Sequence, residues 1–291
     1  MAINNSIAKK KTNLTAYLTQ DAVKNQINEV IGGKNGQRFI SSIVSAVNTN
    51  PALQECTNQS ILSGALLGES LNLSPSPQLG QYYLVPFNDK EKGKVAVFQI
   101  GYKGLIQLAV RSGYYKKLNV IAIKEGELVK FDPINEEIEV NLIDDEEKRE
   151  NAKTVGYYAM FEYTNGFRKA IYWSKKKMES HALNYSAGYR AKKGYTFWEK
   201  DFDGMAYKTM LRQLISKWGI MSIDMQSAME SDMAIISSDG SKNYVDNVEE
   251  ILETPSAEPT EKAEKTEKAV KEPKNVETPE KPADAKSALF E

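Results

Sequence analysis

The amino-acid sequence predicts an α+β fold, in which a helical N-terminal region precedes a central antiparallel sheet with hairpins flanked by helices. Three observations predict it. Apolar residues recur at helical spacing from Asn13 to about Leu73, where Pro75 and Pro77 end the pattern. From Tyr82 onward, short apolar runs alternate with turn signals, which is typical of strands. After Ser237 the chain becomes rich in proline, glutamate and lysine.

Four helices are expected in the N-terminal region. The first carries apolar residues from Leu14 to Ile31 and ends at Gly32-Gly33. A second is expected over 39–47, Pro51 begins a short third, and the fourth covers about 61–71.

The middle of the chain is expected to form strands and three further helices. Residues 82–87 and 94–100 form one predicted hairpin, and 154–163 and 167–173 form another around Asn165-Gly166. Short strands are expected at 118–123, 128–131 and 137–141. Helices are expected from Tyr102 to a stop at Gly113, from a Ser174 cap to about 186, and over 203–218.

These elements predict one large domain at 13–236, with a helical part at 13–73 and a sheet and helix core at 78–225. Residues 1–12 and 237–291 are expected to be disordered, because they offer little apolar surface to bury. Residues 241–291 hold 8 lysines against 13 acidic residues, whereas the rest of the chain carries a net charge of +4. The tail ends in Leu289-Phe290, a possible anchor for a partner.

The sequence lacks the residues and motifs of several kinds of functional site. Cys56 is the only cysteine and His181 the only histidine, which excludes a disulfide, a zinc finger and a paired-histidine metal site. No Gly-x-x-x-x-Gly-Lys-Ser/Thr loop is present to hold a nucleotide. No apolar stretch approaches the length of a membrane span. We therefore expect a cytoplasmic protein with no cofactor and no catalytic site.

Positive charge and aromatic residues gather in the C-terminal half. Residues 168–217 contain 12 basic and 4 acidic residues, and six aromatic residues lie between 185 and 202. Basic groups contact phosphates and flat rings stack on unpaired bases, so this density favours single-stranded nucleic acid. The alternative is a solvated surface over an aromatic core. The helices at 102–111 and 203–218 add cations that recur at helical spacing. The predicted DNA-binding residues are Tyr102, Lys103, Gln107, Arg111, Lys116, Lys117, Lys175, Lys176, Lys177, Arg190, Lys192, Lys193, Trp198, Lys200, Lys208, Thr209 and Arg212.

Acidic residues leave alternatives open. Residues 132–150 hold nine acidic and two basic residues. They form either a nuclease carboxylate cluster, a solvated loop, or a surface that faces a basic patch of a neighbouring subunit. Asp201 or Asp203 is expected to cap a helix, and a metal-binding Asp-x-Asp is the alternative.

Three stretches together resemble the RecT family of phage recombinases. They are Leu71 to Ser76 with Gly80 to Phe87, then Gln99 to Gly113, and last the set Trp198, Asp201, Phe202, Met205, Ala206, Lys208, Thr209 and Arg212. The resemblance covers roughly residues 15–225.

The resemblance implies an ATP-independent single-strand annealing protein with a sheet distantly like that of the Rad52 annealing proteins. Such proteins bind single-stranded DNA exposed by a phage exonuclease, hold an annealed duplex intermediate, and assemble into rings or helical filaments. A host single-strand DNA-binding protein is a further expected partner. Two other functions remain as alternatives, a metal-dependent nuclease and a passive single-strand shield.

Overall fold

The structure is a computed structural model that describes residues 13–32, 35–89, 92–194, 196–237 and 239–244. It combines helices with antiparallel strands, which confirms the predicted class. The expectations for residues 1–12 and for the tail beyond Tyr244 lie outside the described residues. None of the described helices is long and apolar enough to cross a membrane.

The N-terminal region contains five helices rather than four. They are α1 (Leu14–Leu18), α2 (Asp21–Ile31), α3 (Gly36–Asn48), α4 (Pro51–Gln54) and α5 (Asn58–Ser70). The single helix predicted from Leu14 to Ile31 was wrong, because Gln20 is extended and separates α1 from α2. The sequence does indicate this break, because the apolar residues Leu18 and Val23 are five positions apart, which is more than one helical turn.

The first sheet has the strand order β1-β2-β8-β9. The predicted hairpin is confirmed as β1 (Tyr82–Asp89) and β2 (Gly93–Ile100). Strands β8 (Ala234–Ile236) and β9 (Lys242–Tyr244) come from the far end of the chain. Because β9 lies beyond Ser237, the folded region extends past the predicted boundary of the tail, at least to Tyr244.

The second sheet has the order β3-β6-β7, formed by β3 (Tyr115–Lys124), β6 (Thr154–Tyr163) and β7 (Arg168–Ser174). One face of this sheet packs against α8 (Lys175–Tyr185) and α11 (Phe202–Trp218). A separate hairpin of β4 (Leu128–Asp132) and β5 (Glu137–Val140) packs on the other face through Ile123, Tyr158 and Ala170. Within the described residues, the antiparallel strands thus form three sheets rather than one.

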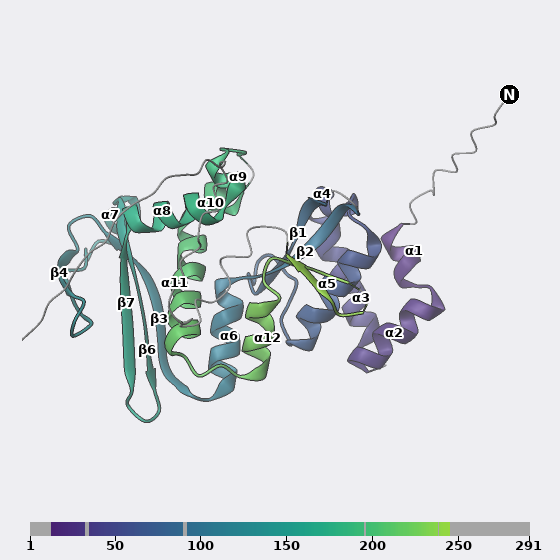
Figure 1. The fold of residues 1–291 in the computed structure, drawn as a ribbon, viewed down its shortest axis with the longest axis horizontal. Helices are drawn as coiled ribbons and strands as arrows, with labels where there is room; N and C mark the ends of the chain where they lie inside the picture. The colour runs from purple at the N-terminus through teal and green to yellow at the C-terminus, as the bar shows by residue number, and fades with distance from the viewer. Residues whose placement is uncertain (1–12, 33–34, 90–91, 195, 238, 245–291) are drawn as a thin grey trace, which may run out of the picture. The chain divides into compact units, whose positions relative to one another are not determined.

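Helices α6 (Tyr102–Ser112), α11 and α12 (Ile223–Glu230) lie between the two larger sheets (Figure 1). Gly113, at φ +76°, ends α6 in the left-handed conformation that glycine adopts without strain. Three short helices were not predicted, namely α7 (Glu146–Asn151), α9 (Ala187–Arg190) and α10 (Phe197–Lys200), and neither was α12.

Candidate nucleic-acid interface

A groove of about 890 Å³ lies where the first sheet, α9, α10 and α11 meet. The β1–β2 hairpin contributes residues from Val85 to Asn88, and α11 contributes its middle turns. The groove brings together five of the residues predicted from the sequence, which are Lys193, Trp198, Lys208, Thr209 and Arg212. These residues are up to nineteen positions apart in the chain, and only the fold of α9 and α10 back onto α11 makes them neighbours.

Three charged residues form the floor of the groove. Lys208 and Arg212 lie one turn apart on α11, and both contact Asp232, which follows α12. The Lys208 Nζ atom lies 2.8 Å from one carboxylate oxygen, and the Arg212 Nη1 atom lies 2.6 Å from the same oxygen. The floor therefore carries a net charge of +1 rather than +2.

Lys208 and Thr209, which were predicted to contact DNA, do not lie on an exposed face of α11. Both residues are buried, with 7% and 5% of their surface exposed. Asp232, which lies between α12 and β8, two elements that the sequence did not predict, pairs with Lys208 on this side of α11. The Asp232 carboxylate also accepts a hydrogen bond from the backbone N–H of Ile100, which ties α11 to β2.

Sequence reasoning missed Asp232. Its place depends on a sharp turn at the next residue, Met233, whose φ is +64°. Left-handed turns are usually signalled by glycine or asparagine, and a methionine gives no such signal.

The exposed cations lie around and beyond the groove. Lys192, Lys193 and Lys200 are exposed and have no ion-pair partner in the described part of the chain. Lys193 lines the groove. Arg190 instead donates hydrogen bonds to the carbonyls of Leu183 and Asn184.

The predicted Lys175–Lys177 cluster begins α8, whereas the other end of that helix, Tyr185, lines the groove. An 11-residue helix is about 16 Å long, so this cluster lies well away from the groove. Lys175 lies 3.8 Å from Asp203 and 3.6 Å above the Phe202 ring, and its partial burial lowers its pKa. Lys176 is exposed, and Lys177 lies over the Trp173 ring.

Trp198 is part of the aromatic core. It is 7% exposed and packs against His181, Tyr189 and Phe202. Its neighbour Phe197 borders both the groove and a second, smaller cavity of about 50 Å³.

The α6 helix reaches this smaller cavity through Tyr102, while Lys103 and Gln107 are exposed. The Arg111 guanidinium donates hydrogen bonds to the carbonyls of Leu71 and Asn72, at 2.7 and 3.3 Å, and so satisfies the end of α5.

The glycines before and within α6 have a packing role. A Cβ atom at Gly101 would lie 2.1 Å from the Gly80 carbonyl oxygen, and one at Gly104 would lie 2.1 Å from that of Gln81. The glycines therefore let the 76–81 loop lie directly against the start of α6. This explains their place in the stretch from Gln99 to Gly113.

The predicted cations of β3 are engaged elsewhere. Lys116 and Lys117 contact Glu162 at 2.6 and 3.6 Å, and the hydrogen bond from Lys116 is the main cause of the lowered pKa of that carboxylate. Neither residue lines the groove.

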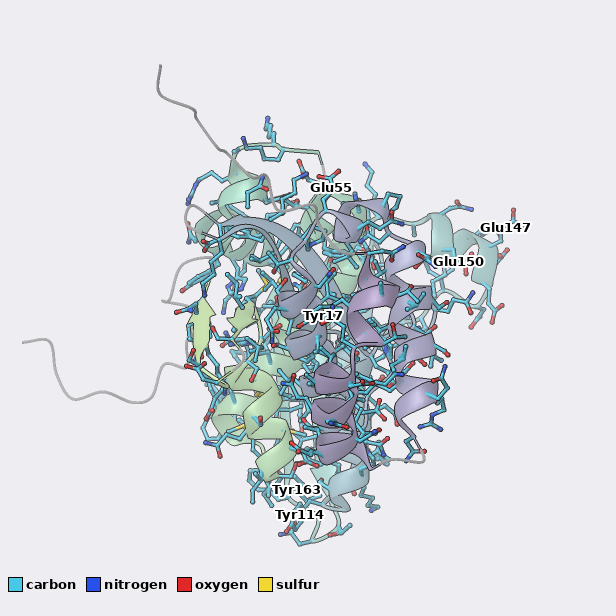
Figure 2. All side chains as sticks on the ribbon, turned by 90° about the vertical axis from the view of Figure 1, so that its right-hand side faces the viewer. Tyr17, Glu55, Tyr114, Glu147, Glu150 and Tyr163 are labelled. Atoms are coloured by element: carbon cyan, nitrogen blue, oxygen red, sulfur yellow. The ribbon has the colours of Figure 1, made fainter. Side chains whose placement is uncertain are left out.

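The two aspartates of the predicted Asp-x-Asp pair have structural partners. Asp201 caps α11 by accepting a hydrogen bond from the Gly204 N–H, as predicted, and Asp203 accepts one from the Tyr157 hydroxyl at 2.5 Å. On α7, Glu147 and Glu150 point into solvent (Figure 2). Among the described residues, no three His, Cys, Asp or Glu side chains are placed to hold a metal ion.

Cations, aromatic rings and a groove are features that many nucleic-acid-binding proteins share. The model of the RecT family matches residues 37–247, and the chain belongs to that family. It is 38% identical to the uncharacterized protein YqaK of Bacillus subtilis (strain 168), over 90% of this chain and 88% of YqaK. It is 28% identical to Protein RecT of Escherichia coli (strain K12), over 77% of this chain and 82% of that protein. The protein is thus a phage-type recombination protein of the single-strand annealing class.

Proposed function

We propose that this protein binds single-stranded DNA along the groove and anneals it to a complementary strand without hydrolysing a nucleotide. The observation that carries the proposal is the groove itself, where exposed cations, aromatic rings and a weakly positive floor meet. Cations at the rim offset the repulsion between two backbones, and base pairing then supplies the driving force.

The proposal includes the partners expected of this class. A phage exonuclease supplies the single strands, and a host single-strand DNA-binding protein is displaced from them. The annealed duplex stays bound as an intermediate.

We also propose that the protein works as a homo-oligomer, in a ring or filament. An exposed apolar surface around Tyr163 supports this part. Phe167, Trp218 and Ile220 are each between 43% and 50% exposed. The Phe167 ring stacks on the Tyr163 ring, and the backbones of Trp218 and Ile220 form hydrogen bonds with the Tyr163 hydroxyl. Figure 2 shows Tyr163 and Tyr114 at one end of the molecule. Apolar surfaces of this kind commonly mark protein contacts.

The test is the rate at which two labelled complementary strands pair, measured by energy transfer with no nucleotide present. We expect the protein to raise this rate. Removing charge at Lys192 and Lys193 together should reduce the gain, whereas Lys24→Ala, an exposed cation on α2, serves as the matched control.

Three outcomes contradict the proposal, each in a different way. A strict requirement for ATP would refute the mechanism. A slower rate than that of free strands would indicate a passive shield. Shortening of an end-labelled strand on addition of Mg²⁺ would indicate a nuclease.

A further inference from the structure

Gln99 is a polar residue at a buried position of β2. Residues 95–100 of this strand are all buried, and Gln99 is the one among them with a polar side chain. It is 5% exposed. A buried carboxamide is unfavourable unless both its donor and its acceptor groups find partners.

The Gln99 carboxamide has no hydrogen-bond partner among the described residues. Among the described residues, however, every polar side-chain atom that is shielded from solvent has a hydrogen-bond partner. The two facts agree because Gln99 borders both the groove and the smaller cavity, so that its amide faces their shared space. The hydrogen-bond donor and acceptor of the Gln99 amide thus face the groove, and no described residue of the protein binds them.

The surroundings of this amide define what it can bind. Tyr83 lies directly opposite Gln99 on β1, and the Phe197 ring lies 5.5 Å from the Tyr83 ring. Lys208 borders both cavities as well, and Arg212 lies one helical turn further on. The amide is therefore placed between aromatic rings and cations.

We propose that this corner of the groove is a nucleobase site, in which Gln99 hydrogen-bonds the edge of an unpaired base of the bound strand. The inference rests on the proposed function and specifies how the groove holds DNA. Every base presents both donors and acceptors on its edge, which a carboxamide complements, and a flat face, which the rings complement. A bare phosphate would use the amide N–H groups and leave the carbonyl oxygen unpaired.

The site has a consequence for annealing. A base whose Watson–Crick edge contacts Gln99 cannot pair at the same time, so this contact exists on single strands and is lost when the base pairs with its complement. Gln99 therefore favours the single-stranded state and should contribute nothing to the affinity for a finished duplex.

The test compares binding of a natural single strand and of an abasic strand of equal length, by fluorescence anisotropy. We expect the wild-type protein to bind the natural strand more tightly. Gln99→Met, which keeps the side-chain size, should weaken binding of the natural strand by about tenfold and leave abasic binding unchanged. The matched control is Gln213→Met, since Gln213 is a half-buried glutamine of α11 outside both cavities.

Two results would overturn the base site while leaving DNA binding intact. One is equal affinity of the wild-type protein for natural and abasic strands, a measurement that needs no variant and so does not depend on folding. The other is an equal loss by Gln99→Met on both strands, which would mean a general structural effect. Failure of the wild-type protein to bind either strand would instead refute the proposed function.

Discussion

The ion pairs in the groove floor lead to a quantitative prediction for Asp232→Asn. The substitution keeps the size of the side chain but removes the single negative charge between Lys208 and Arg212. The Asp232 side chain is 2% exposed, and those of Lys208 and Arg212 are 9% and 14% exposed. Two cations are thereby left close together with little water around them.

Removing one partner of a buried ion pair typically costs about 3–5 kcal/mol. Because both cations border an open groove, water reaches them in part, and we expect the lower end of that range, about 3 kcal/mol. For a chain of this size each kcal/mol lowers Tm by roughly 2–4 °C, so Asp232→Asn should melt about 6–12 °C below the wild-type protein.

Thermal and urea unfolding of the free protein measure this loss. A triple variant, Lys208→Met with Arg212→Met and Asp232→Leu, is the control, since replacing all the charges by apolar groups is often neutral. The triple variant should recover most of the stability. A free energy of unfolding for Asp232→Asn within about 0.5 kcal/mol of wild type would refute the reasoning, because the two cations would then be fully solvated from the groove.

Four further predictions concern other parts of the protein. Lys193→Ala should reduce the salt dependence of single-strand binding by about 0.7 in the log–log slope and leave Tm unchanged. Trp198→Ala should destabilise the fold by about 3–5 kcal/mol in urea unfolding, because Trp198 is a core residue, whereas Trp198→Phe should cost less. Truncation after Ser237 should lower Tm, since it removes β9 and the Tyr244 hydroxyl bond to the α12 end, whereas truncation after Tyr244 should not. Burial raises the pKa of Glu127, but hydrogen bonds from Arg149 and two backbone N–H groups outweigh it and lower that pKa. The Glu127 carboxylate therefore stabilises the fold at pH values above its unfolded pKa, and this stabilisation is lost as pH falls through its folded pKa. Glu127→Gln should flatten the acid-unfolding curve over this pH range.

Local signals in the sequence located the long elements well. The Asn165-Gly166 turn, the Ser174 cap and the Gly113 stop all lie where the structure has them. Each of these residues acts on its own neighbours in the chain, so its effect can be read without knowledge of the fold.

The groove could be predicted only in part. Several basic and aromatic residues of 168–217 line the groove, but Lys208 is buried against Asp232, which lies twenty-four residues further along. The proposed role of Gln99 likewise depends on the residues that face it, and the sequence alone does not show which residues surround a single glutamine in an apolar run. The short helix α10 did carry a local signal, which sequence reasoning missed, because Thr196 and Glu199 form a capping box at its start.

In the proposed complex with DNA, a floor that is partly neutralised by its own carboxylate would treat the two parts of a nucleotide differently. Phosphates are attracted most by the exposed, unpaired cations at the rim, such as Lys193, because those at the floor already have Asp232 as a partner. Beside the floor lie the Tyr83 and Phe197 rings and the Gln99 amide, which suit bases. Rim substitutions should therefore change the salt dependence of binding, whereas Gln99 substitutions should change the affinity at every salt concentration and leave the slope alone. If both kinds of substitution changed the slope equally, the division of the groove into a phosphate rim and a base floor would be wrong.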